Sequence, residues 1–217
     1  GEIGGLGLAF GLKVELLHKF YADSPAELLI IDTDTRSCPP QEAQQVIRTV
    51  ARQLMRSTRP IEWIYKKTDS VLRGPVASEV EALRDILGAS RVLLVPANPS
   101  KGRIVRDGTY LINGKPLSET DFVNDPEYPA VTSRVLAFPA FSGSDQVHLG
   151  KSGQPLAREG IIIGQAETTE DLLRWAERMD ANTVMAGAGE FFEAILRSKG
   201  FSGKTVTGKI DFQSARN

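Results

Sequence analysis

The sequence predicts an α/β protein with a mainly parallel, open sheet, helices on both faces and a small antiparallel hairpin excursion. Short runs rich in Ile, Leu and Val alternate along the chain with segments in which apolar residues recur every three or four positions. This alternation is typical of a parallel sheet that helices cover on both sides. Two tight-turn pairs, Asp107-Gly108 and Asn113-Gly114, interrupt it and indicate the hairpin.

The first part of the chain carries patterns for both kinds of element. Pro39 and Pro40 suit the first turn of a helix, because no hydrogen bond is lost there for want of a proline N–H. Gly88 is placed as a C-cap glycine. In chain order we expect an uncapped helix within residues 1–11, strands over 12–17 and 28–31, a helix from Pro39 and Pro40, a strand over 61–65, a helix over 76–87 and a strand over 91–95.

The second part begins with irregular segments and then returns to the α/β rhythm. Thr168 or Thr169 is placed to cap a helix with an acidic first turn. In order we expect a hairpin around residues 109–112, a polar surface flap over 117–129, a long loop over 138–158, a strand over 160–164, the capped helix, a strand over 183–186, a helix opening at Gly187-Ala188-Gly189, and a weakly ordered tail from Gly200.

Composition excludes several classes of protein. The net charge of −1 and pI near 6.2 give no basic surface for nucleic acid. No apolar run reaches the roughly 18 residues that span a bilayer. The single cysteine, Cys38, rules out an internal disulfide framework and favours a reducing cytoplasm. His18 and His148 are the only histidines, so we expect no His-rich metal site.

One charged stretch stands out. Residues 66–74 read Lys-Lys-Thr-Asp-Ser-Val-Leu-Arg-Gly and lie between a predicted strand and a predicted helix. Ligands of open α/β sheets bind at the carboxyl ends of the strands, which is where this stretch lies. A salt-bridged structural turn explains the same residues equally well. Lys66 and Lys67 alternate along the strand, so at most one of them faces the crevice from it.

Polar residues follow other predicted strands too, and parallel strands end at one edge of a sheet. Arginine donates two parallel hydrogen bonds to a carboxylate or phosphate, and helix N-termini favour anions. The set therefore predicts a crevice for a small anionic ligand. Turn capping by the aspartates and tight packing at the glycines remain alternatives. The residues are Asp32, Asp34 and Arg36, then Lys67, Asp69, Ser70 and Arg73, then Asn98, Gly102 and Arg103, and finally Gly187 and Gly189.

The stretch over residues 66–74 closely resembles the signature of the four-carbon acid sugar kinase family. Further matches follow in order along the chain. They are Asp32-Thr33-Asp34-Thr35-Arg36, Pro96-Ala97-Asn98-Pro99, Gly102-Arg103, the segment 107–117, Thr169-Glu170-Asp171-Leu172 and Ala186-Gly187-Ala188-Gly189. The resemblance covers roughly residues 1–199. It implies an amino-terminal sugar-acid-binding domain, with residues 200–217 as a tail or linker towards an absent nucleotide-binding domain.

The resemblance implies an ATP- and Mg²⁺-dependent kinase that phosphorylates the terminal hydroxyl of threonate, erythronate or 3-oxo-tetronate. Arg36 and Arg73 would bind the substrate carboxylate, while Asp69 would orient a hydroxyl with support from Lys67 and Ser70. Asn98 would complete the substrate site, Arg103 would reach either the substrate or a nucleotide phosphate, and Gly187 and Gly189 would face the nucleotide. No metal ligand is assigned. The base is either Asp69 or an aspartate in the family's Asp-Asp-x-Thr-Gly motif, which is missing upstream of Glu2.

Other functions remain open from the sequence. With its second domain missing, the chain alone is expected to be inactive, and a non-catalytic module for small carboxylates is the main alternative. A phosphatase-like enzyme built on the turn of Asp32 and Asp34 is a further alternative with less support from the sequence. We expect the sugar acid as partner, with ATP bound through the second domain, no nucleic acid, no membrane and a possible homo-oligomer.

Overall fold

The centre of the molecule is a five-stranded parallel sheet in the order β3-β10-β4-β9-β8. The structure is a computed structural model that describes residues 1–18, 24–144 and 146–203. The strands are β3 (Tyr65–Lys67), β10 (Thr183–Gly187), β4 (Arg91–Val95), β9 (Gly160–Gly164) and β8 (Val147–Gly150). They are parallel, so their carboxyl ends lie at one edge, and the predicted α/β class is confirmed.

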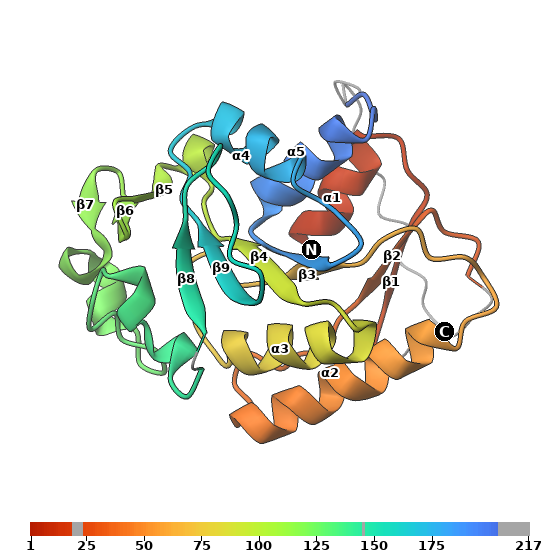
Figure 1. Ribbon diagram of the computed structural model, residues 1–217, viewed down its shortest axis with the longest axis horizontal. Helices are drawn as coiled ribbons and strands as arrows, with labels where there is room; N and C mark the ends of the chain where they lie inside the picture. The colour runs from red at the N-terminus through yellow and green to blue at the C-terminus, as the bar shows by residue number, and fades with distance from the viewer. Residues whose placement is uncertain (19–23, 145, 204–217) are drawn as a thin grey trace, which may run out of the picture.

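Helices cover both faces of this sheet, as Figure 1 shows. Successive residues of a strand point to opposite faces, so Val92 and Leu94 of β4 join one core while Leu93 and Val95 join the other. The first core is closed by α3 (Val76–Leu87), and α2 (Pro40–Met55) packs outside it. The second core is closed by α4 (Thr169–Ala176) and α5 (Gly189–Ser198).

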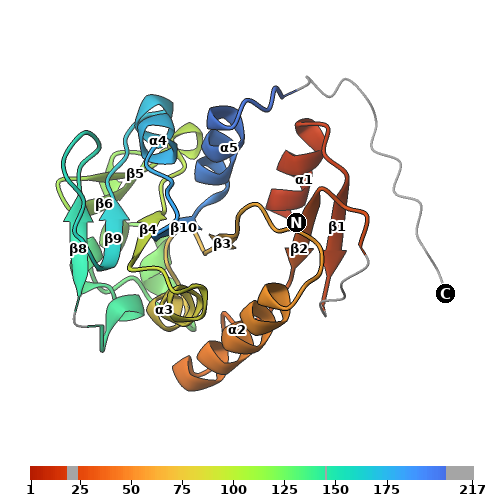
Figure 2. The same ribbon diagram turned by 45° about the vertical axis from the view of Figure 1, so that its right-hand side comes forward.

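The first two strands form a sheet of their own. β1 (Val14–Leu17) and β2 (Leu28–Ile31) pair in parallel, and α1 (Glu2–Ala9) precedes them. Figure 2 shows this pair set apart from the five-stranded sheet. The expectation that the polar turn after residues 28–31 ends a strand of the main sheet is therefore wrong. The predicted burial of that strand is also too high, since all four residues of β2 are half-buried.

The predicted hairpin is confirmed and extended to three antiparallel strands, β5 (Arg103–Arg106), β6 (Thr109–Ile112) and β7 (Lys115–Pro116). Asp107 and Asn113 adopt positive φ in its two turns, as such turns require. Short 3₁₀ helices supply most of the surrounding turns. They are η1 (Pro99–Lys101), η2 (Leu117–Glu119), η3 (Asp121–Asn124), η4 (Val135–Ala137) and η5 (Pro139–Phe141).

Several other expectations need adjustment. The strand expected over residues 61–65 begins only at Tyr65, and Ile61 is exposed. The loop expected over 138–158 contains the edge strand β8. Thr168 caps α4 in a reciprocal capping box with Asp171, so the first of the two predicted caps is confirmed. The predicted tail lies outside the described residues from position 204 onward.

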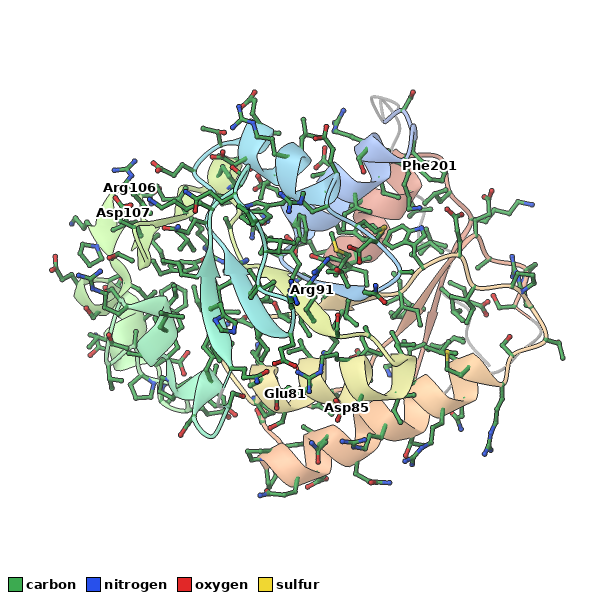
Figure 3. The ribbon with its side chains drawn as sticks, in the orientation of Figure 1. Glu81, Asp85, Arg91, Arg106, Asp107 and Phe201 are labelled. Atoms are coloured by element: carbon green, nitrogen blue, oxygen red, sulfur yellow. The ribbon has the colours of Figure 1, made fainter. Side chains whose placement is uncertain are left out.

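Within residues 1–18, 24–144 and 146–203, no helix combines the length and apolar character needed to cross a bilayer. Charged side chains at the tip of the hairpin instead project outward. Figure 3 shows Arg106 and Asp107 at that tip, away from the sheet. Arg106 pairs there with Glu167 across 2.5 Å.

Candidate functional site

The two lysines at the end of β3 point to opposite sides. Lys66 pairs with the buried Glu79 of α3, with 3.0 Å between the ammonium nitrogen and the carboxylate. Lys67 instead donates to the Thr68 carbonyl and lies 3.3 Å from the Glu2 carboxylate. Lys67 is therefore the lysine that faces the carboxyl edge of the sheet, while Lys66 links β3 to α3 through its ion pair.

The turn after β3 is organised by Asp69. Its carboxylate accepts two hydrogen bonds from the Arg73 guanidinium, at 3.1 and 2.9 Å, and two more from the backbone N–H groups of Val71 and Arg73. Leu72 takes a positive φ of 61° inside this turn, an uncommon conformation for a non-glycine residue. Burial alone would raise the pKa of Asp69, but the hydrogen bonds and charge of Arg73 outweigh it and lower that pKa.

Arg73 also binds a carboxylate from a distant part of the chain. Its Nη1 lies 2.9 Å from Oδ2 of Asp125, which follows η3. The other oxygen of Asp125 accepts the backbone N–H groups of Glu127 and Tyr128. The Tyr128 N–H and the Arg73 guanidinium both lower the pKa of Asp125. Two carboxylates of the chain therefore occupy the fork that was predicted to bind the substrate.

Arg103 lies beside the same cluster. Its guanidinium donates to the Ser70 hydroxyl, so β5 reaches the turn after β3. The ring of Phe122 lies 5.6 Å from the guanidinium carbon of Arg73 and 5.7 Å from that of Arg103. These distances suit cation–π contacts. The structure thus brings together four of the predicted residues, Asp69, Ser70, Arg73 and Arg103.

The loop after β2 approaches this cluster from the other side. The backbone of Arg36 lies so close to Gly74 that a Cβ there would come within 2.6 Å of the Arg36 carbonyl oxygen. Gly74 also has φ of 87°, which favours glycine. The Tyr128 hydroxyl donates to the same carbonyl at 2.7 Å. The Arg36 side chain is exposed, and its guanidinium has no hydrogen bond or ion pair with the residues that the structure describes.

A second anion-binding arrangement lies at the ends of β3 and β10. The Glu2 carboxylate contacts the ammonium groups of Lys67 and Lys101, at 3.3 and 2.8 Å. A Cβ on Gly189, the first residue of α5, would come within 2.9 Å of both carboxylate oxygens. Burial works to raise the pKa of Glu2, but the hydrogen bond from Lys101 and the charge of Lys67 lower it overall. This arrangement would suit a phosphate as well as a carboxylate.

Gly187, one of the two glycines predicted to face the nucleotide, has a structural role. Gly187 has φ of 146°, and a Cβ there would come within 2.0 Å of the Val95 carbonyl oxygen.

Asn98 is buried, and its side-chain oxygen accepts the Glu190 N–H in the first turn of α5. The Asn98 side chain therefore binds the first turn of α5, while its backbone pairs with that of Arg103.

Two hollows adjoin these clusters. A cavity of about 330 Å³ lies between the Leu72–Pro75 backbone and the flap over residues 117–129, and Arg73 lines it. A larger groove of about 770 Å³ separates β2 from β3. Its walls are mainly apolar, including Leu28, Ile30 and Ile64, and Lys67 and Asp32 lie along it.

The described residues hold no cluster of three or more His, Cys, Asp or Glu side chains suited to a metal. Asp32 and Asp34 are exposed, and Oδ1 of Asp32 accepts the Asp34 N–H at 3.2 Å, as expected of a turn cap. Mg²⁺ commonly binds through one or two carboxylates together with phosphate oxygens, so a metal arriving with a nucleotide needs no such cluster.

Three residues of these clusters were not predicted from the sequence: Glu2, Phe122 and Asp125. None lies at a predicted strand end of the main sheet, which was the signal used. The Asn-Asp-Pro turn around Asp125 marked only a polar flap. The partner of Arg73 could not be deduced, because 52 residues separate the two in the chain.

Comparisons with known proteins find relatives of this chain. A family model described as the sugar-binding N-terminal domain matches residues 8–195. A D-threonate kinase of Salmonella typhimurium is 33% identical over 123 residues, which are 57% of this chain and 29% of that protein. A D-erythronate kinase of Heliobacterium modesticaldum is 29% identical over 188 residues, 78% of this chain and 42% of that protein. The chain spans less than half the length of these curated relatives.

Solved structures share the fold. A domain of unknown function from Bordetella bronchiseptica, crystallised with bound citrate as a domain-swapped dimer, has a TM-score of 0.77 and 24% identity. The match covers 92% of this chain and 53% of that one. A Haemophilus influenzae protein gives a TM-score of 0.75 at 20% identity, over 94% of this chain and 55% of that one. At these identities the likeness concerns the fold alone.

Proposed function

The chain belongs to the sugar-binding N-terminal domain family, and on that premise we propose that it is the substrate-binding part of an ATP-dependent sugar acid kinase. The substrate is a four-carbon sugar acid such as threonate, erythronate or 3-oxo-tetronate, and the reaction phosphorylates its terminal hydroxyl. The names of relatives support this reading, since they include D-threonate, D-erythronate and 3-oxo-tetronate kinases.

The observation that carries the proposal is that Arg73 and Arg103 meet at one turn, against which the backbone of Arg36 packs. Gly74 brings the Arg36 loop against this turn, and Ser70 binds Arg103 to it. A guanidinium suits a carboxylate because both are planar and form two parallel hydrogen bonds. The unpaired Arg36 binds the ligand carboxylate first, and Arg73 joins when Asp125 leaves its Nη1.

The remaining residues take supporting roles in this proposal. The lowered pKa of Asp69 makes it a weak proton acceptor, so its part is to hold Arg73 and orient a substrate hydroxyl. Ser70 positions Arg103. Lys67 places its positive charge at the strand ends, where it stabilises the negative charge of a phosphoryl group. Asn98 acts indirectly, by fixing the start of α5.

ATP and Mg²⁺ belong to the same proposal. The phosphates of ATP approach the Lys67–Lys101 pair and the start of α5 at Gly187 and Gly189, and a second domain supplies most of the nucleotide site. When bound, Mg²⁺ neutralises phosphate charge. We place the protein in the cytoplasm, which Cys38 favours as a free thiol. A homo-oligomer is compatible with the dimeric relative.

A non-catalytic module for small carboxylates is the alternative. It is favoured by the state of the carboxylates near the arginines, because both Asp69 and Asp125 are bound to Arg73. Neither is free to act as a base in this arrangement. Binding of the sugar acid without phosphorylation, in a protein that also contains the second domain, would select this alternative.

Isothermal titration calorimetry with D-threonate tests the site. Arg103→Ala removes a guanidinium of the cluster, whereas Arg106→Ala removes one from the exposed tip of the same strand. Loss of a charge-assisted contact to a ligand costs about 2–5 kcal/mol, so Arg103→Ala should bind at least about 30-fold more weakly. Arg106→Ala should bind like the unmodified chain. Equal affinity in both variants would remove Arg103 from the site.

A further inference from the structure

Tyr110, near the arginine cluster, has a buried hydroxyl that makes no hydrogen bond to the described residues. Tyr110 of β6 is fully buried, and its hydroxyl has no hydrogen-bond partner within the part of the chain that the structure describes. Buried hydroxyl groups in folded proteins are nearly always hydrogen-bonded, because leaving one unpaired is costly. The only other buried side-chain atom of this kind in the described residues is Oγ1 of Thr68.

Strand register places Tyr110 next to Arg103. Arg103 pairs directly with Ile112, and Val105 pairs directly with Tyr110. Residues two apart on a strand share a face, so Tyr110 and Arg103 are diagonal neighbours on one face of the hairpin. A long side chain and an aromatic ring can meet across such a diagonal.

The electrostatic surroundings of the phenol agree with this placement. Burial raises the pKa of Tyr110, the charge of Arg103 lowers it and the charge of Asp69 raises it. The charges of Arg103 and Asp69 therefore act on the hydroxyl, which stays protonated near neutral pH and can donate a hydrogen bond. The Phe138 ring contacts the Tyr110 ring, with 6.3 Å between centroids, and holds its orientation.

We propose that Tyr110 is a ligand-binding residue of the site, whose hydroxyl donates a hydrogen bond to an oxygen of the sugar acid beside Arg103. This inference rests on the proposed function and adds a specificity-determining contact to it. The ligand reaches Tyr110 when the flap over residues 117–129 moves and takes Phe122 off the two guanidinium groups. An apolar acid of the same size leaves the hydroxyl unpaired and binds less well.

Tyr110→Phe tests the inference because it removes only the oxygen. Calorimetry with D-threonate should show affinity lowered about tenfold, the effect of one hydrogen bond of ordinary strength. Urea unfolding should show a variant that is as stable as the unmodified chain or more stable, since the lost hydroxyl has no partner in the free protein.

Tyr65→Phe is the matched control for stability. The Tyr65 hydroxyl donates to the Ala188 carbonyl at 2.7 Å, so its removal should lower stability measurably. If Tyr110→Phe binds D-threonate as tightly as the unmodified chain, the inference is overturned. A stability loss in Tyr110→Phe equal to that in Tyr65→Phe also overturns it, because the hydroxyl then has a partner without ligand. If the unmodified full-length protein binds no sugar acid, the proposed function fails, and the inference fails with it.

Discussion

The buried ion pair of Lys66 and Glu79 should dominate the stability of the layer beneath the site. Glu79→Ala leaves the Lys66 ammonium, whose side chain is 15% exposed, with only the carbonyl of its neighbour as an acceptor. Breaking a buried pair from one side typically costs about 3–5 kcal/mol. Because the Lys66 ammonium keeps that acceptor and some water, we expect the lower end, about 3 kcal/mol.

A double-mutant cycle gives this expectation a sharp test. Lys66→Met should cost a similar amount, since it strands the Glu79 carboxylate with only the Thr35 hydroxyl. Glu79→Leu is the second single variant of the cycle and should cost about as much as Glu79→Ala, because it also leaves Lys66 without its carboxylate. Replacing both residues, as Lys66→Met with Glu79→Leu, should return the free energy of unfolding to within about 1 kcal/mol of the unmodified chain. Urea unfolding followed by circular dichroism measures all four proteins. Single variants that lose under about 1 kcal/mol, or single losses that simply add in the double variant, would refute the reasoning.

The same pair also connects stability to binding. Thr35 donates to Glu79, and Thr35 precedes Arg36 in the loop that faces the cluster. Glu79→Ala should therefore loosen that loop and weaken sugar acid binding even where the protein stays folded. Titration at a temperature well below the melting transition separates the two effects.

Three further outcomes follow from the contacts described above. Asp125→Asn should bind D-threonate about 5–30 times more tightly, because it weakens a competing bond to Arg73 that is worth about 1–2 kcal/mol. Weaker binding in calorimetry would mean that Asp125 itself contacts the ligand. The lowered pKa of Asp69 means that its ionised carboxylate stabilises the folded state. This stabilisation is complete above the ordinary pKa of 3.8 and is lost as the pH falls through the lower pKa of the folded state. The melting temperature should therefore fall less between pH 7 and pH 3 in Asp69→Asn than in the unmodified chain. Gly187→Ala should cost about 3 kcal/mol, because its methyl group meets the backbone of β4, whereas Gly88→Ala, with open space around it, should cost about 1 kcal/mol in the same unfolding assay.

The layered fold could be predicted because each core element carries its own periodicity. Val92 and Leu94 face one side of β4 and Leu93 faces the other, a pattern that a continuous apolar run indicates directly. Sheet membership could not be predicted in this way. Nothing in the run over residues 28–31 distinguishes a strand of the main sheet from one of a separate pair, because hydrogen bonding between strands depends on partners far away in the chain.

The site was predictable only in part, for a similar reason. Arg73 and Arg103 follow strands and carry suitable chemistry, so the strand-end rule identified both. The carboxylate that binds Arg73 comes from the flap, and Phe122 reaches the cluster from an irregular 3₁₀ turn. Irregular segments have no periodicity that fixes their direction, so their contacts come from the packed structure alone.

The groove between β2 and β3 has a consequence for how the chain behaves in solution. Neither strand has a β partner on its groove side within the described residues, and Leu16 and Ile61 are exposed beside it. Open strand edges bordered by apolar side chains act as templates for a further strand. A preparation of this chain alone should therefore lose monomer as its concentration rises, and an added strand-forming peptide that fills the groove should slow that loss.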